Sequence, residues 1–498
     1  MQTDEKPLEL RGGWGSAFVP LAVFLFFCVM LFIVLHAFDI AALAGGGVVA
    51  LLVGALFARR YSDYWDHAMR GIADRTSIAI VLILFVIGLF SELVKVTNVS
   101  VGFVWLANEI GIHGAAFTVF TFVTVCIVAV ATGSSIGTMF IAYPIFYTAG
   151  VAIGAEPTLL AGAIVSGAIF GDNLAPISDT TIISASAQRF RRREGVADIP
   201  GVVAQRARYA LTAAAIAAVL FLLFGFVGNE SGQQAQIAHA DAKPLIMLVP
   251  VALMLVVSIV TRDIFKAITV GLVTGLVTAL ATGLIGWSGV FGAKDGAVTG
   301  FIATGTTAII PTVALVIVVF GIVGVLRGAG VLDKTIQALT RSAALRTPRG
   351  SEAAIGIGAA VTTLLFGGVT SASIMTFGPV ADEIGSRTGL HPYRRANVMD
   401  CFAMSLASVV PLLSAYLFIA SQLTASQDGA PAINAGQLFT TALYPLVLTV
   451  VMVVAVATGW GRRFEGEGGV ASRAPVPPVT EPVTAPSPEA DEATAERT

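Results

Sequence analysis

The chain has 498 residues, of which 56% are hydrophobic and 12% charged, with a mean hydropathy of +0.85 and a formal net charge of −2. Soluble proteins carry about 25% charged residues, so the composition excludes a soluble globular protein. A nucleic-acid partner is also excluded, because it would require a basic domain. Three cysteines, Cys28, Cys126 and Cys401, lie in separate apolar runs and predict neither a disulfide framework nor a metal site.

Fourteen segments qualify as membrane-spanning helices, which need about 20 mostly apolar residues. Two pairs of them are separated only by short glycine-rich breaks. In chain order the segments are 16–37, 40–58, 78–97, 115–131, 136–154, 158–188, 209–228, 244–261, 265–287, 306–326, 352–366, 371–383, 396–423 and 435–460. Residues 61–71, between the second and third, fit either an interfacial amphipathic helix or an ordinary loop. The predicted fold class is an all-α polytopic membrane protein.

Lysine and arginine residues indicate the orientation. With a cytoplasmic N-terminus, the inside loops and both termini carry 26 of the 29, and the outer side receives only Lys95, Lys243 and Lys294. This asymmetry follows the positive-inside rule. We therefore expect both termini in the cytoplasm. The same assignment leaves no Lys or Arg at the membrane centre, so we expect no fixed cation in the interior.

The two halves of the chain are related by a shift of 235 residues. The shift pairs Gly133 with Gly368 and Pro176 with Pro411, and further prolines and glycines match at the same offset. Each half then holds seven spans, and because seven is odd the second half crosses the membrane in the opposite sense. Inverted-topology repeats with interrupted helices at the midplane are the architecture of secondary transporters, so we predict two such repeats.

These observations predict five regions. They are a cytoplasmic N-terminus at 1–15, a first transmembrane repeat at 16–228, an external linker at 229–243, a second transmembrane repeat at 244–460 and a cytoplasmic tail at 461–498. From about Glu465 the tail is rich in proline, alanine and threonine. Such a segment buries too little apolar area to offset its ordering entropy, so we expect the tail to be disordered.

The sixth segment carries the chemistry. It is too long for one straight crossing, and Pro176 predicts a helix break because proline lacks an N–H and clashes with the preceding turn. The break brings together oxygen-bearing side chains, which suit Na⁺ or a proton: Asp172, Asn173, Ser178, Asp179, Thr180 and Thr181. A second, hydroxyl-rich break includes Thr132, Gly133, Ser134, Ser135 and Thr138, and its repeat mate includes Thr370, Ser371 and Ser373.

Charged residues inside a membrane are costly and mark functional sites. Asp172 and Asp179 are the main candidates, although acids that merely cap half-helices are the alternative interpretation. Asp400 and Glu92 are further candidates. With no fixed cation available, the carboxylates must be neutralised by a mobile one. Exclusive occupancy of one acid by either H⁺ or Na⁺ is sufficient for antiport, so Na⁺ is expected at Asp172 and Asp179.

The run GDNLAPISDTT (Gly171–Thr181), preceded by TGSSIGT (Thr132–Thr138), resembles the signatures of the NhaC-type sodium/proton antiporter family. The resemblance implies Na⁺/H⁺ exchange across a bacterial inner membrane within a superfamily of inverted-repeat ion transporters. It also implies that the residues of these two motifs form the ion site. The second half departs from the pattern, since the positions shifted from Asp172 and Asp179 hold Ala407 and Ser414.

The alternative function is Na⁺- or H⁺-coupled exchange of small organic acids or amino acids, because relatives with the same signature transport them. No Arg is expected near the site to receive a carboxylate, although half-helix amides could do so. The sequence contains no HExxH motif and no phosphate-binding loop with a soluble domain, so we expect a secondary transporter rather than an enzyme, without a cofactor. The expected partners are Na⁺, H⁺ and membrane lipid, and a homodimer is left open.

Overall fold

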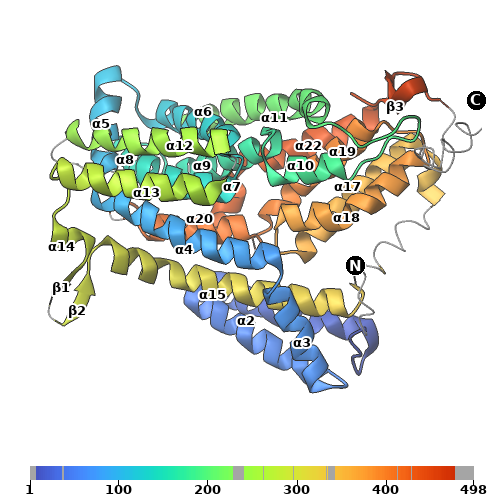
Figure 1. The fold of residues 1–498 in the computed structure, drawn as a ribbon, viewed down its shortest axis with the longest axis horizontal. Coiled ribbons are helices and arrows are strands. Elements are labelled where there is room, and N and C mark those ends of the chain that lie inside the picture. The colour runs from blue at the N-terminus through green and yellow to red at the C-terminus, as the bar shows by residue number, and fades with distance from the viewer. Residues whose placement is uncertain are drawn as a thin grey trace, which may run out of the picture.

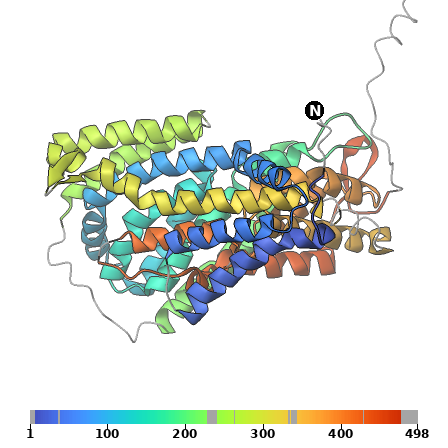
Figure 2. The same ribbon diagram turned by 90° about the horizontal axis from the view of Figure 1, so that it is seen from below.

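The computed structural model describes residues 7–35, 39–227, 241–261, 263–294, 296–331, 334, 343–411, 413–427 and 429–476. These residues are almost entirely helical, and the long helices run roughly along the longest axis of the molecule (Figures 1 and 2). Within these ranges six helices are long and apolar enough to cross a membrane, and the bent pair α21–α22 makes a seventh if it counts as one span. Six shorter apolar helices accompany them. The prediction of a helical, multi-pass membrane protein is therefore confirmed.

The first half of the chain forms a continuous series of helices, in which η marks short 3₁₀ or π segments. In chain order they are η1 (Gly13–Phe18), α1 (Val19–Val29), η2 (Met30–Val34), α2 (Ile40–Ala55), α3 (Tyr61–Ile72), α4 (Arg75–Val96), α5 (Val99–Ile110), α6 (Gly114–Thr132), α7 (Ser135–Ala142), η3 (Tyr143–Tyr147), α8 (Thr148–Ala152), α9 (Pro157–Leu174), α10 (Asp179–Ser186) and α11 (Ile199–Val227).

The second half adds two small antiparallel strand pairs to its helices. Its elements are η5 (Lys243–Met247), α12 (Leu248–Thr261), α13 (Ile264–Ala281), α14 (Trp287–Val290), β1 (Gly292–Lys294), β2 (Ala297–Thr299), α15 (Phe301–Gly328), η6 (Ala343–Arg346), α17 (Pro348–Leu365), α18 (Thr370–Ser386), α19 (Pro392–Ala403), η7 (Leu406–Val409), α20 (Ala415–Ala425), α21 (Ala435–Thr441), α22 (Leu443–Thr458), β3 (Phe464–Glu465), η8 (Glu467–Gly469) and β4 (Ala471–Ser472).

Helix α9 lies at the centre of the molecule and is buried along almost its whole length. It packs against α6, α11, α21 and α22. Small residues make this close packing possible: a Cβ added to Gly171 would overlap Ala129 of α6. The core of the fold therefore holds the end of α9 rigidly, and this end carries the Gly-Asp-Asn run singled out in the sequence.

Three predicted elements differ from the structure. The segment predicted over 396–423 is two helices, α19 and α20, separated by an irregular stretch that contains Pro411. The span predicted over 209–228 begins ten residues earlier, as α11, because Asp198 caps its first turn by accepting the Gly201 N–H at 2.8 Å. The residues between the third and fourth predicted spans form the additional helix α5.

Helix α3 resolves the choice between loop and helix for residues 61–71. It packs along α15, with Gly71 against the backbone of Gly324. Neither position has room for a Cβ, since an atom added to Gly71 would lie 2.6 Å from the Gly324 Cα. One face of α3 is thus fixed by protein contacts, while Tyr61 and Met69 remain exposed.

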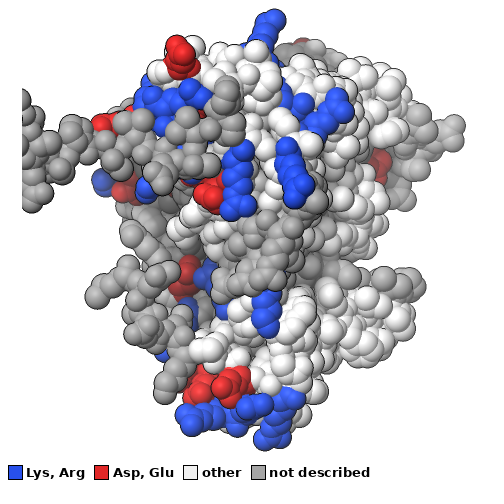
Figure 3. Space-filling model, turned by 90° about the vertical axis from the view of Figure 1, so that its right-hand side faces the viewer, with Lys and Arg blue, Asp and Glu red and all other residues white. Residues whose placement is uncertain are grey.

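Lys and Arg side chains gather at one end of the molecule. This end, which we call the basic end face, lies at the right of Figure 1 and carries β3. It faces the viewer in Figure 3, where blue side chains are spread over it. The loop after α10 contributes Arg189, Arg191, Arg192 and Arg193 to this region of the chain. The distribution agrees with the clustering of basic residues that the sequence predicts for one membrane side.

The residues after α22 form an ordered segment, which corrects the prediction of disorder from about Glu465. Strand β3 pairs with β4, and Phe464 forms a bridge to Leu390. The buried Glu465 carboxylate accepts the backbone N–H groups of Arg191 and Arg192, each at 2.7 Å. Loop amides that would otherwise lack acceptors are thereby satisfied. We call residues 459–476 the C-terminal strap; the predicted tail beyond 476 lies outside the described residues.

His391 connects the C-terminal strap to α19. Its Nε2–H donates to the Gly469 carbonyl at 3.1 Å and its Nδ1 accepts the Tyr393 N–H at 3.2 Å. Burial lowers the pKa of this imidazole to about 4. The residue lies outside the apolar spans, and the hydrogen bond that Nδ1 accepts requires the neutral ring.

The His391 geometry leads to a pH-dependent stability. Below about pH 6.5 the unfolded chain binds a proton at His391 and the folded protein does not, so the wild-type protein loses stability as the pH falls towards 4. His391→Asn keeps an N-cap acceptor and removes this titration. We expect the melting temperature of the purified variant to fall by several degrees less than that of wild type between pH 7.5 and 5, measured by thermal unfolding. Parallel curves would contradict this account.

Candidate functional site

The α9–α10 break forms where the sequence predicts it. Ala175, the residue before Pro176, has an extended conformation with ψ 128°, as expected because proline disfavours a helical residue in front of it. Helix α10 then begins at Asp179, so the single predicted segment is two half-helices. The break leaves backbone carbonyls at the end of α9 that need partners in the protein interior.

A second break separates α6 from α7. Gly133 adopts a left-handed conformation with φ 64°, which a residue with a Cβ rarely tolerates. Ser134 then caps α7 by accepting the Gly137 N–H at 3.2 Å. The hydroxyls of Thr132 and Thr138 are 2.8 Å apart and close the turn.

The corresponding break in the second half lies between α17 and α18. Gly368, which is 235 residues after Gly133, is also left-handed, with φ 79°. Helix α18 begins at Thr370, whose hydroxyl lies 3.1 Å from that of Tyr416. Ser373 is buried one turn further on and bonds to Thr362 at 2.8 Å and Thr363 at 2.9 Å.

The breaks surround a cavity of about 540 Å³. Both halves of the chain contribute to its wall, together with the beginning of α4 and the end of α12. Its polar and glycine lining residues are Thr132, Gly133, Ser134, Ser135, Asp172, Asp179, Ser258, Gly368, Thr370, Ser371 and Tyr416. Eight of the residues predicted for the site thus lie around one space.

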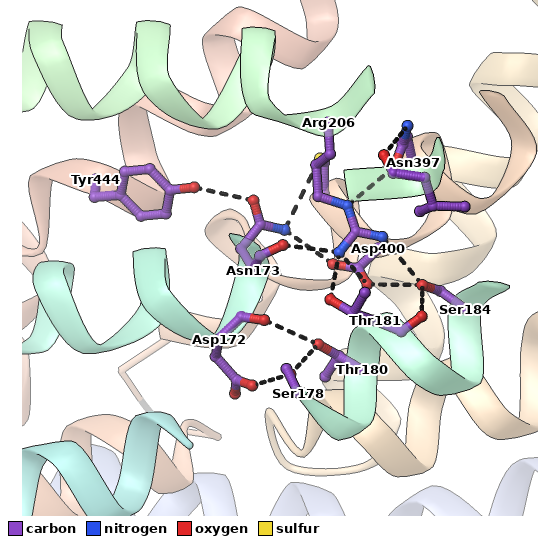
Figure 4. Close-up of polar contacts among 12 residues, drawn as sticks. Asp172, Asn173, Ser178, Thr180, Thr181, Ser184, Arg206, Asn397, Asp400 and Tyr444 are labelled. Carbon is purple, nitrogen blue, oxygen red and sulfur yellow. Dashed lines mark hydrogen bonds and ion pairs between the residues drawn. The ribbon is translucent and has the colours of Figure 1, made fainter. Parts of the chain in front are cut away.

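The two aspartates differ in their surroundings. Asp172 is 8% exposed, and its two carboxylate oxygens accept hydrogen bonds from Ser135 of α7 and Ser178 of the break. Figure 4 shows the bond from Ser178. Asp179 begins α10 and is exposed to the cavity. Among the described residues no Lys, Arg or His forms an ion pair with either one.

Thr180 connects the side chain and the backbone of the break. Its hydroxyl donates to the Asp172 carbonyl at 3.3 Å and lies 2.9 Å from the Ser178 hydroxyl. Asp172 and Ser178 are therefore held in place by α10 as well as by the cavity wall. Pro176 sits at the exposed surface of the break and makes no cavity contact.

A buried arginine lies on the far side of the break. Arg206 of α11 forms an ion pair with Asp400 of α19 at 2.9 Å, and both side chains are 0% exposed. Its Nη1 also donates to the Asn173 carbonyl at 2.8 Å and to Thr181 at 2.9 Å (Figure 4). The expectation that no fixed cation reaches the interior is thus wrong for Asp400, while Asp172 and Asp179 remain apart from it.

The remaining predicted residues divide between the two sides of the break. Asn173, Thr181 and Asp400 belong to the arginine side and do not line the cavity. Thr138 and Ser373 are buried in hydrogen bonds within their own breaks. Glu92 lies in α4 and is not part of the cavity wall.

Five further residues that contact the break or the cavity are not predicted by the sequence: Arg206, Ser184, Asn397, Tyr416 and Tyr444. Arg206 was placed in a cytoplasmic loop, because apolar character begins only at about residue 209. The sequence does contain a signal for an earlier helix start. Asp198 is a typical capping residue, and Pro200 follows it in the first turn of α11. The two tyrosines come from α20 and α22, and no local pattern relates them to the break.

The comparisons with known proteins agree with the two motifs. Residues 12–226 match the model described as the Na⁺/H⁺ antiporter family. The matched residues, all in the first half of the chain, are similar to this family. The resemblance to NhaC-type antiporters is thus confirmed. Both first-half breaks, Asp172 and the part of the cavity wall that comes from the first half fall within the matched residues.

Two curated relatives extend this finding. The chain is 31% identical over 179 residues to the malate-2H⁺/Na⁺-lactate antiporter of Bacillus subtilis, a match that covers 36% of each protein. It is 27% identical over 323 residues to the Na⁺/H⁺ antiporter NhaC of Alkalihalophilus pseudofirmus, a match that covers 60% of this chain and 67% of the relative. The chain thus spans about a third of the first relative's length and two thirds of the second's.

The cavity geometry predicts which residues water reaches. Met375 of α18 lines the cavity and is 50% exposed, whereas its neighbour Ile374 is fully buried. Because Cys28, Cys126 and Cys401 are buried, Met375→Cys should be the reactive thiol. We expect a charged, membrane-impermeant maleimide to label it from the side that carries the basic end face, and Ile374→Cys to stay unlabelled. Equal labelling of both variants would contradict the cavity.

Proposed function

We propose that this protein is a secondary antiporter that exchanges Na⁺ for H⁺, with Asp172 and Asp179 as the shared cation site. The observation that carries the proposal is their arrangement: two carboxylates face one cavity at a helix break, without an ion-pair partner among the described residues. A transporter rather than an enzyme is also the activity that the family match supports.

The physical reason for coupling is the cost of a charged carboxylate in an apolar interior. Either a proton or Na⁺ neutralises Asp172, and one ion must leave before the other binds. Ser135 and Ser178 donate to the carboxylate when it is free. Their hydroxyls can turn to offer oxygen lone pairs to Na⁺, since a hydroxyl is both donor and acceptor. Exchange then follows from mutually exclusive occupancy.

We further propose that the chain crosses the membrane about fourteen times, in two inverted repeats. Helix starts recur at the offset of 235 residues: α7 at Ser135 and α18 at Thr370, α9 at Pro157 and α19 at Pro392. In Figure 1, α9 lies to the left of α10 whereas α19 lies to the right of α20, so equivalent helix pairs run in opposite directions.

The proposed location is a bacterial inner membrane, with the basic end face in the cytoplasm. The side chains in Figure 3 support this orientation through the positive-inside rule. Both termini lie on the cytoplasmic side in this arrangement, and the cavity would open towards that compartment through the region of Met375.

The antiport proposal is tested with purified protein in proteoliposomes that carry a pH-sensitive dye and radioactive sodium. We expect Asp172→Asn and Asp179→Asn each to lower Na⁺-dependent proton flux by more than about tenfold, the effect of losing ~1.4 kcal/mol in binding. Asp39→Asn is the matched control, because Asp39 caps α2 far from the cavity and asparagine caps equally well. Na⁺-dependent flux retained by Asp172→Asn would refute the proposal.

Exchange of small organic acids is the second candidate. The cavity of about 540 Å³ is much larger than one Na⁺ ion. Helices α7 and α18 both begin at its wall, so their N-terminal N–H groups could receive a carboxylate. The relative from Bacillus subtilis is named for malate and lactate. Uptake of labelled malate, lactate and amino acids, measured beside sodium, separates the candidates. Saturable malate uptake that Asp172→Asn abolishes would favour this alternative over bare-cation exchange.

A further inference from the structure

The Arg206–Asp400 ion pair is buried at the core of the molecule, next to the cation site but outside its cavity. Removing two charges from water is expensive, and such a pair persists only where further hydrogen bonds complete it. Here they do: Ser184 donates to Asp400 at 3.0 Å and Asn173 donates to its other oxygen at 2.9 Å. Asn397 accepts from the Arg206 Nε at 3.0 Å.

The guanidinium of Arg206 joins both sides of the break. It binds the Asn173 carbonyl at the end of α9, and it binds Thr181 at 2.9 Å and Ser184 at 3.1 Å in the first turns of α10 (Figure 4). Asn173 directly follows Asp172 in the chain. This short peptide therefore faces the cavity through Asp172 on one side and contacts Arg206 through Asn173 on the other. A change in the arginine's position therefore moves the carboxylate that faces the cavity.

The same contacts determine which atoms remain for a cation. The last carbonyls of α9 are already bound, Asp172 by Thr180 and Asn173 by Arg206. Both oxygens of Asp400 are occupied as well. These groups are engaged within the break, whereas the Asp172 and Asp179 side chains line the cavity, where a cation can reach them. Charge also matters, because Asp400 cancels the guanidinium that would otherwise repel a cation nearby.

We propose that Arg206, neutralised by Asp400, is a positioning residue of the cation site, and that Asp400 itself exchanges neither Na⁺ nor H⁺. The inference rests on the proposed antiport function. It assigns the two buried acids of the core different tasks: Asp172 receives the transported ion, while Asp400 balances the arginine that holds the break in shape.

The proposal predicts an asymmetric mutant cycle. Asp400→Asn leaves an uncompensated positive charge beside the site, so we expect the Na⁺ concentration for half-maximal exchange to rise by about tenfold or more. The double variant Arg206→Gln/Asp400→Asn has no net charge there but also lacks the guanidinium that positions the break, so its half-maximal Na⁺ concentration should lie between those of wild type and Asp400→Asn. A value equal to that of wild type would refute the positioning role. The ratio of protons to sodium ions should stay unchanged in both, measured in proteoliposomes as dye response and sodium uptake.

A second buried pair provides the matched control. Arg394 and Glu352 are 2.8 Å apart and 1% and 0% exposed, and Glu352 also pairs with Arg462 at 2.6 Å. None of these contacts involves a half-helix of the break. Glu352→Gln should lower thermal stability and leave the half-maximal Na⁺ concentration unchanged. If Asp400→Asn lowers only the amount of folded protein, as this control does, the pair is merely structural and the inference is wrong.

Two further results would overturn the inference. A changed proton-to-sodium ratio, or equal loss of Na⁺ affinity in the single and double variants, would make Asp400 an ion ligand.

A second variant covers the case in which Asp400→Asn fails to fold. Asn397→Ala removes one contact of Arg206 and should raise the half-maximal Na⁺ concentration about threefold. An unchanged value would refute the positioning role. Absence of Na⁺-dependent proton flux in wild type would instead refute the proposed function.

Discussion

The structure depends on one constraint: a helix broken inside an apolar core must find partners for its freed backbone groups. At the α9–α10 break these partners are a hydroxyl from Thr180 and a guanidinium from Arg206. The peptide Asp172–Asn173 therefore has two different surroundings. Asp172 faces the cavity, and Asn173 faces the hydrogen-bond network of Arg206 and Asp400. In the proposed antiporter, the residue that receives the cation and the residue that contacts Arg206 are therefore neighbours in the chain, Asp172 and Asn173.

The two halves of the chain share geometry but differ in chemistry. Gly133 and Gly368 adopt the same left-handed turn, and the helices that follow both end at the cavity. Yet the second half supplies hydroxyls such as Thr370 and Tyr416, where the first supplies carboxylates. The cavity therefore has carboxylates on its first-half wall only, and under the proposed function this wall supplies a single cation site.

Local patterns were sufficient to predict most of the architecture. Pro176 locates the α9–α10 break because its effect on the backbone is intrinsic, and Gly133 locates the α6–α7 break for the same reason. Arg206 could not be recognised from apolar character, since its burial depends on partners 22 to 194 residues away, in other helices. The C-terminal strap was not predicted because its composition is poor in apolar residues. Its order depends on contacts of single residues, such as the hydrogen bonds that Glu465 accepts from the loop after α10.

The C-terminal strap also has a consequence for biogenesis. Glu465 accepts amides from residues that precede it by 274 and 273 positions. During synthesis, the loop after α10 therefore emerges long before the acceptor that completes it. Until the chain has been made as far as Glu465, the backbone N–H groups of Arg191 and Arg192 lack this acceptor and must be hydrated, so the loop after α10 reaches its final hydrogen bonding long after its own synthesis.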